Sequence, residues 1–229
     1  MKERSGTAPP YRRDDGRRLA LWLALVAVMV AIGYGTRASA GKPDPQVLYE
    51  WTTAIGALVQ DGIVLFLVLA IAGFSTRLLA LRPPRAYSAT ARVLGVALVA
   101  IYLVEIAYGR LVHVGNEQGL TPNHWEPRHA AAYIANAIVI CTWVPFVEEL
   151  TYRGLGYSLL ERFGRWPAIV AVGLLFGLAH GLIESLPVLA VFGGVLAWIR
   201  SRTGSVYPGM VLHSLFNLVA LVAAVTLPR

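Results

Sequence analysis

The sequence predicts an all-α fold: a polytopic membrane helical bundle of about seven transmembrane helices, within a range of six to eight, around an intramembrane polar cavity. Two observations lead to this prediction. Of the 229 residues, 56% are hydrophobic and only 14% are charged, whereas a soluble domain carries about 25% charged residues. The apolar residues gather in long stretches separated by short polar ones, and stretches of about 18 residues or more are typical of membrane spans.

The order of these stretches sets the expected elements. Residues 1–18, rich in Arg, Asp and Pro, are expected to form a disordered basic tail, and residues 19–229 a single membrane domain. Spans are expected at about 19–36, 51–76, 93–112, 132–161, 166–184, 187–199 and 205–227. A simple crossing needs about 20 residues. The fourth span is therefore expected to begin with an interfacial helix or to run obliquely, and the sixth to extend into its flanks.

The first span allows a second interpretation. Basic residues precede it and Ala38-Ser39-Ala40 follows it, an order that also resembles a cleavable signal peptide. We favour an uncleaved span, because a protein with many later spans needs no removable signal.

The net charge of +7 is interpreted as an orientation signal. Fourteen Lys and Arg residues fall in the tail and in alternate connectors, against five in the other connectors and the C-terminus. This predicts a multi-pass protein of the cell membrane with a cytoplasmic N-terminus. The basic residues form no patch interleaved with base-stacking aromatic residues, so the lipid bilayer and no nucleic acid is expected as a partner.

Ionisable groups inside apolar spans are costly and mark functional sites. In the fourth span, Glu149 and Arg153 lie four residues apart and share a helix face, while Glu148 lies about 100° around the helix. One carboxylate can thus be neutralised while its neighbour is left free as a general base. A buried structural ion network is the alternative for this pair of acids.

Two later spans add further polar side chains. Phe176 and His180 share a face of the fifth span, and His180 lies as many residues after Gly164 as Glu148 lies before it. In an antiparallel hairpin that turns at Gly164, residues equidistant from the turn lie at the same depth. A helix-to-helix hydrogen bond is the other interpretation of this histidine. His213 and Asn217 share a face of the last span and resemble an oxyanion-stabilising pair.

Together the motifs carry a family resemblance. Glu148-Glu149-x-x-x-Arg153, Phe176-x-x-x-His180 and His213-x-x-x-Asn217 resemble, in order, the three motifs of the CAAX-protease and bacteriocin-processing family of intramembrane glutamic endopeptidases, which includes prenyl-protein type II CAAX proteases. The resemblance covers a motif core at about 130–227. It implies that Glu148 activates a water for peptide-bond hydrolysis and that His180 helps to hold that water. It further implies that His213 and Asn217 stabilise the oxyanion and that Glu149, Arg153 and Phe176 support the site.

The resemblance also implies the substrate class and leaves alternatives. The expected substrate is a membrane-anchored or lipid-modified protein. The alternatives are a non-catalytic immunity or assembly factor on the same fold, and a transporter, which repeated topology would favour. Glu148, His180 and His213 also form a conceivable zinc set. Because there is no H-E-x-x-H motif and Asn217 is a poor zinc ligand, metal-free catalysis without a cofactor is expected.

Overall fold

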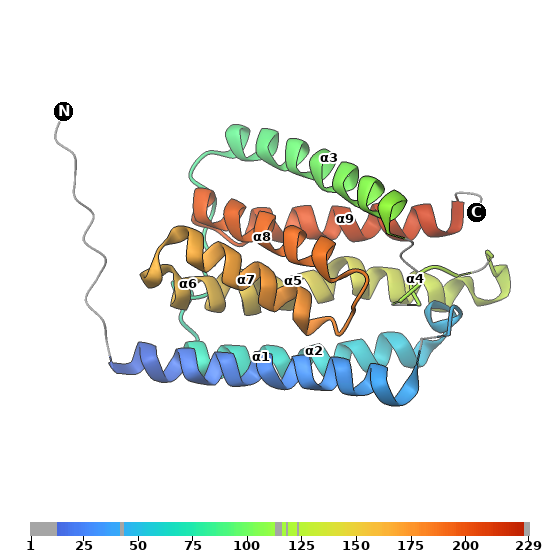
Figure 1. The fold of residues 1–229 in the computed structure, drawn as a ribbon, viewed down its shortest axis with the longest axis horizontal. Coiled ribbons are helices and arrows are strands. Elements are labelled where there is room, and N and C mark those ends of the chain that lie inside the picture. Colours follow the sequence, from blue (N-terminus) through green and yellow to red (C-terminus); the bar gives the residue numbers. More distant parts are fainter. Residues whose placement is uncertain (1–12, 42–43, 113–115, 118, 123, 227–229) are drawn as a thin grey trace.

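The computed structural model describes residues 13–41, 44–112, 116–117, 119–122 and 124–226, and within these ranges the chain forms helices and no strand (Figure 1). The separate helices are α1 (Arg13–Ala40), the 3-10 turn η1 (Val47–Tyr49), α2 (Trp51–Ala72), α3 (Tyr87–Leu111), α7 (Arg165–Ala179), α8 (Leu186–Thr203) and α9 (Tyr207–Thr226). Between α3 and α7 one long helical run is composed of η2 (Pro127–His129), α4 (Ala130–Ile138), η3 (Val139–Trp143), α5 (Val144–Glu148), η4 (Glu149–Gly156), α6 (Tyr157–Leu160) and η5 (Glu161–Phe163). The predicted all-α bundle is confirmed.

Helical segments occupy the positions of all the expected spans, with shifted ends. In the described part of the chain, five helices are long and apolar enough to cross a membrane: α1, α2, α3, the run from Pro127 to Phe163, and α9. The shorter α7 pairs with α8, which extends beyond its expected 13 residues to 18. The tail was predicted too long, because α1 begins at Arg13 and residues 13–18 are helical. The rest of the tail, residues 1–12, lies outside the described residues.

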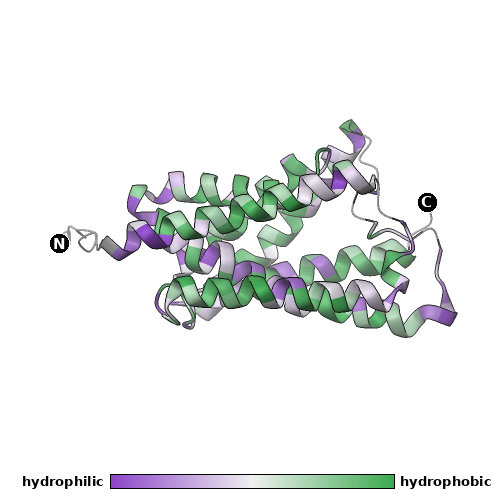
Figure 2. Cartoon of the chain, turned by 90° about the horizontal axis from the view of Figure 1, so that it is seen from below, coloured by the Kyte–Doolittle hydropathy of each residue, from purple (hydrophilic) through white to green (hydrophobic). Residues whose placement is uncertain are grey.

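The outer surfaces of the helices are apolar, as a lipid-facing bundle requires. On α3, Val96, Val99 and Leu103 are 61–71% exposed, and the hydropathy colouring shows apolar residues along the outer faces and polar residues mostly at the ends (Figure 2). The connectors after α2, η5 and α8 lie at the end of the bundle where α1 begins (Figure 1). Arginines in and beside these connectors therefore lie at one end, which agrees with the predicted positive-inside pattern: Arg77, Arg82, Arg85, Arg162, Arg165, Arg200 and Arg202.

The run from Pro127 to Phe163 contains 37 residues, about 55 Å of helix at 1.5 Å per residue, well beyond the roughly 30 Å of a hydrocarbon core. Its two π-helical stretches, η3 and η4, flank α5. Such stretches are rare and frequently occur at functional sites. The long fourth span predicted from the sequence is therefore present, with a local geometry that its sequence did not indicate.

Close backbone contacts hold α7 and α8 together beside this run. A Cβ on Gly173 would lie 2.7 Å from the Ala190 carbonyl oxygen and from the Gly194 nitrogen, and one on Gly193 would lie 3.0 Å from the Gly173 Cα. Small residues at a helix interface let two backbones approach, which is a common way of packing helices in membranes. The hairpin thus brings the end of α7 toward the interior of the bundle.

The N-terminal part of the chain packs directly on η4. The fully buried Trp22 of α1 donates from Nε1 to the Thr151 carbonyl at 2.9 Å. Gly156 makes room for the Trp22 ring, since a Cβ there would come within 2.3 Å of it. Gly154 similarly lies against the backbone of Leu79 in the α2–α3 connector. α1 is therefore part of the packed bundle around the polar segment.

Candidate active site

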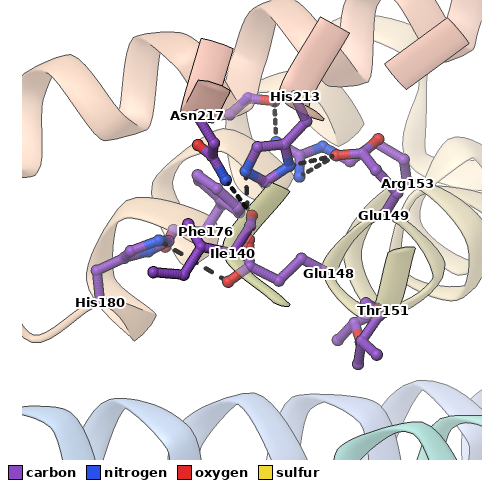
Figure 3. Close-up of polar contacts among 11 residues, drawn as sticks. Ile140, Glu148, Glu149, Thr151, Arg153, Phe176, His180, His213 and Asn217 are labelled. Atoms are coloured by element: carbon purple, nitrogen blue, oxygen red, sulfur yellow. Dashed lines mark hydrogen bonds and ion pairs between the residues drawn. The ribbon is translucent and has the colours of Figure 1, made fainter. Parts of the chain in front are cut away.

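Glu148 and Glu149 lie where α5 ends and η4 begins, in the middle of the long helical run. His180 lies at the C-terminal end of α7, and His213 and Asn217 lie on α9. The end of α7 and the helix α9 thus converge on the two glutamates of the long helical run (Figure 3). The hairpin that turns at Gly164 brings α7 back along the long helix, which is why the equal spacing around that glycine predicted the meeting of Glu148 and His180.

Glu149 and Arg153 form an ion pair sealed inside the bundle. Both side chains are 0% exposed, and Arg153 Nη1 donates to Glu149 Oε1 at 2.9 Å. Arg153 also donates from Nη2 to the Gly193 carbonyl at 3.0 Å, which ties η4 to α8. On α9, Gly209 lies against this carboxylate, since a Cβ there would come within 2.2 Å of Oε2. The predicted pairing is confirmed, and Glu149 is neutralised and fixed in place.

Glu148 has a different environment from its neighbour. Its side chain is 18% exposed, and each of its oxygens faces a histidine (Figure 3). Oε1 lies 3.9 Å from His180 Nε2, and Oε2 lies 3.6 Å from His213 Nε2. These distances exceed a direct hydrogen bond but allow a water molecule about 2.8 Å from both atoms of a pair. A carboxylate in this position can accept a proton from such a water.

His180 is held in one tautomer by its own helix. Its Nδ1 lies 2.7 Å from the Phe176 carbonyl oxygen, and because a carbonyl only accepts, Nδ1 carries the proton. In the neutral imidazole Nε2 is then an acceptor. The ring is 18% exposed, as is Glu148. His180 can therefore accept a hydrogen bond from a water that lies between it and Glu148.

His213 bridges the two glutamates. Its Nε2 faces Glu148, and its Nδ1 lies 3.4 Å from Glu149 Oε1. The side chain is 4% exposed. The same helix face carries Gly209, four residues earlier, which leaves the space that Glu149 fills. The ring is thus fixed between a sealed ion pair and the partly exposed carboxylate.

Asn217 makes a contact that the sequence did not predict. Its Nδ2 donates to the Ile140 carbonyl at 2.8 Å, in the π-helical stretch η3 (Figure 3). This contact anchors α9 to the part of the long helical run that precedes Glu148. The amide has a second N–H, and the side chain is partly exposed. Asn217 and His213 therefore lie together on α9 as expected, with one of the Asn217 donors already used by the backbone.

Phe176 is the aromatic centre of the site. It is fully buried, its ring lies beneath the Arg153 guanidinium at 4.3 Å, and its centroid lies 4.6 Å from that of His180 and 5.9 Å from that of His213. A cation over an aromatic face in an apolar setting is stabilised by about 2 kcal/mol. Phe176 thus packs against Arg153 and both histidines.

Two contributors to the site were not predicted from the sequence. The Ile140 carbonyl carries no side-chain signal, and only the structure reveals it as the acceptor for Asn217. Gly209 does have a signal, because it precedes His213 by one helical turn and so shares its face. A glycine at that position indicates that another group approaches the helix there.

Glu148, His180 and His213 are the residues of the zinc set considered from the sequence. In the described part of the chain, no group of three or more His, Cys, Asp or Glu side chains converges in a way that could hold a metal ion. Glu148 directs its two oxygens to two different histidines at 3.6 and 3.9 Å. No step of the chemistry below is assigned to a metal, and metal-free catalysis stays a prediction for the chelation experiment.

Comparison with known proteins identifies the region that carries the site. Residues 130–219 match the family model described as type II CAAX prenyl endopeptidase Rce1-like. No curated protein and no solved structure matches the chain. The matched region contains every candidate site residue: Glu148, Glu149, Arg153, Phe176, His180, His213 and Asn217. Residues 1–129 lie outside the match.

Proposed function

We propose that the protein is an intramembrane glutamic endopeptidase, because residues 130–219 match the Rce1-like type II CAAX prenyl endopeptidase family model and carry the motifs that suggested this resemblance. It hydrolyses a peptide bond of a membrane-associated or lipid-linked protein, with a water activated by Glu148 as the nucleophile. The five helices of the described residues that are long and apolar enough to cross a membrane support a reaction within the bilayer.

The contrast between the two neighbouring glutamates carries the proposal. Glu149 is fully buried and paired with Arg153 at 2.9 Å, whereas Glu148 is partly exposed and lies 3.6 and 3.9 Å from two imidazole nitrogens. A structural ion network has no need of a second carboxylate held beyond direct hydrogen-bond distance of its partners. A general base must instead be reachable by water and able to accept a proton.

In the proposed reaction Glu148 accepts one proton from the bound water while the water oxygen attacks the scissile carbonyl carbon. The carbonyl π electrons move to its oxygen and form a tetrahedral oxyanion. When the intermediate collapses, the C–N bond breaks, and the proton held by Glu148 passes to the leaving amine. No covalent enzyme intermediate forms, and the carboxylate is regenerated.

The other side chains have separate roles in this proposal. Nε2 of His180 accepts a hydrogen bond from the second O–H of the water and so directs a lone pair of the water oxygen toward the substrate. His213 and the second N–H of Asn217 donate to the oxyanion, where positioned donors lower the barrier. Glu149 and Arg153 hold His213 and the π-helical segment in place.

The test is cleavage of a membrane-presented peptide library, with prenylated and unprenylated members, by purified protein in lipid vesicles. Glu148→Gln keeps the shape of the side chain and removes the base. Loss of a general base costs about 10²–10⁴-fold in rate, so kcat should fall by about that factor. Glu105→Gln, which removes an intramembrane carboxyl on α3 outside the site, should cleave as the wild type does.

Each reaction is repeated with a metal chelator. Metal-free catalysis predicts that the wild-type rate survives chelation, and its loss with recovery on adding Zn²⁺ would assign the reaction to a metalloenzyme. Undiminished cleavage by Glu148→Gln would remove Glu148 from the mechanism. Cleavage by neither protein, across both classes of peptide, would favour the non-catalytic immunity or assembly factor.

A further inference from the structure

The connector between α7 and α8, residues 181–185, follows directly after His180 and is held by residues of α1, of α3 and of the segment after α3. Gly181 has φ +65° and lies against Gly33 of α1. A Cβ on Gly181 would come within 2.5 Å of the Gly33 backbone, and one on Gly33 within 3.2 Å of Gly181. This contact therefore requires glycine at position 181, leaves little room for a side chain at position 33, and holds the first residue of the connector against α1.

Two tyrosines hold the connector further along. Tyr34 of α1 donates its hydroxyl to the Leu182 carbonyl at 3.1 Å, and Tyr108 of α3 donates to the Glu184 carbonyl at 2.8 Å. Both bonds end on backbone atoms, so they restrain the path of the chain whatever side chains it carries.

Glu117 completes this set of contacts. Its carboxylate accepts the Ile183 N–H on Oε1 at 3.2 Å and the Ser185 N–H on Oε2 at 2.8 Å. Arg37 of α1 pairs with Oε1 at 2.8 Å, and the Glu117 side chain is only 1% exposed. The carboxylate also lies at the N-terminal end of α8, where the helix dipole favours a negative charge. One buried side chain thus joins α1, the connector and the start of α8.

We propose that Glu117 is a positioning residue for His180. The inference rests on the proposed function, because it assigns Glu117 an effect on turnover. His180 caps α7, so its ring position depends on the last turn of that helix and on the five residues after it. Glu117 and Arg37 fix those residues and thereby hold His180 Nε2 at the distance from Glu148 that admits one water. The region of the chain outside the family match then acts on the site within it.

The first measurement is hydrogen exchange of the peptide covering residues 178–186 in purified protein. Glu117→Gln retains one acceptor oxygen but turns an NH₂ toward the second amide and removes the charge opposite Arg37. Exchange at Ile183 and Ser185 should become about tenfold faster or more, since both amides lose a charge-assisted bond. Asn136→Ala is the matched control, because Asn136 is also buried and donates to the Leu48 and Glu50 carbonyls away from the connector.

The second measurement is steady-state cleavage by the wild type, Glu117→Gln, Asn136→Ala and Glu117→Asp. Displacing a catalytic group by about 1 Å can reduce the rate by about 10²-fold, so we expect Glu117→Gln to lower kcat by at least about tenfold while KM changes less than about twofold. Asn136→Ala should leave the ratio of kcat to its wild-type value near one. Glu117→Asp, which keeps the charge, should recover part of kcat.

The outcomes separate the inference from the proposed function. Unchanged exchange of residues 178–186 in Glu117→Gln would show that Glu117 does not hold the connector and would overturn the inference. Faster exchange with unchanged kcat would overturn the positioning role. An equal fall in kcat for Asn136→Ala would assign the effect to general destabilisation and also overturn it. If the wild type cleaves nothing while exchange responds as expected, the proposed function has failed and the contacts of Glu117 stand as structural.

Discussion

At the scale of single residues, the site contrasts two carboxylates that are adjacent in the sequence. Glu149 compensates the charge of Arg153 in a fully buried position. Glu149→Gln leaves that guanidinium without a counter-ion, and removing one partner of a buried pair costs about 3–5 kcal/mol. We therefore expect a large fall in unfolding temperature in detergent, measured by differential scanning fluorimetry. Glu148→Gln, which breaks no ion pair shorter than 3.6 Å, should unfold close to the wild type. Equal unfolding temperatures for the two variants would contradict this division of roles.

Glu117 predicts a pH dependence of stability. Burial alone would raise the pKa of this carboxyl, but the backbone amides of Ser185, Glu184 and Ile183 outweigh it and hold the pKa below its ordinary value of 4.5. A folded pKa below the unfolded one stabilises the protein above the unfolded pKa, and this contribution is lost as the pH falls through the folded value.

The wild type should therefore unfold at a higher temperature than Glu117→Gln near neutral pH. The gap should narrow as the pH falls below about 4.5 and close at lower pH. Unfolding temperatures of both proteins across this range measure it. A gap that stays constant down to strongly acidic pH would show that the charge of Glu117 does not stabilise the fold.

The sequence predicted the residues of the site better than their contacts. Glu148, His180 and His213 could be found because ionisable groups in apolar spans stand out. The contact of Asn217 with the Ile140 carbonyl could not be found, since a backbone acceptor carries no residue type. Glu117 was equally hidden, because it lies in a polar connector where an acid is ordinary and its partners are main-chain amides.

At the scale of elements, the hydrophobic pattern predicted which segments are helical but not the geometry within them. The π-helical stretch η3 is apolar and η4 contains Glu149 and Arg153, but neither composition indicates a π-helix in place of an α-helix. Contacts from distant parts of the chain fall within η4, such as the Trp22 bond to the Thr151 carbonyl. Helix ends were misplaced for a related reason, because α1 continues past its apolar run into charged residues that a helix accepts equally well.

The α7–α8 hairpin yields a prediction about packing. In Gly173→Ala the new Cβ would lie 2.7 Å from backbone atoms of α8, which cannot move aside as a side chain would. Overpacking costs about 1–3 kcal/mol, or a fall in unfolding temperature of about 2–4 °C per kcal/mol for a chain of this size. Because α7 carries His180, turnover should fall as well.

Gly194→Ala is the control on the facing helix, since a Cβ there meets nothing within 4 Å. Replacing an unhindered helical glycine by alanine stabilises a helix by up to about 1 kcal/mol. Gly194→Ala should thus unfold at or above the wild-type temperature. If Gly173→Ala does the same, the two helices can separate without cost, and the close contact does not determine the position of α7.

At the scale of the whole molecule, the family match and the structure divide the chain differently. The match begins at residue 130, yet the matched helices do not pack as a separate unit. Trp22 fills the space left by Gly156, and Leu79 lies against Gly154. α1 and the α2–α3 connector thus contribute to the packing around the polar segment, although no sequence motif in them indicates it.

The alternation of helix directions predicts how the molecule lies in the membrane. The positive-inside pattern places the start of α1 in the cytoplasm, so Ser39 at the end of α1 should be external and Ser88 at the start of α3 internal. Both serines are exposed, and they lie at opposite ends of the bundle. In a Cys141→Ser background, a membrane-impermeant maleimide should label Ser39→Cys in intact cells and Ser88→Cys only after permeabilisation. The reverse labelling would invert the orientation. Labelled Ser39→Cys at the full-length mass would show that α1 is retained. An unlabelled protein shortened to begin after Ala40 would instead support the signal-peptide interpretation and remove Trp22 from the site's support.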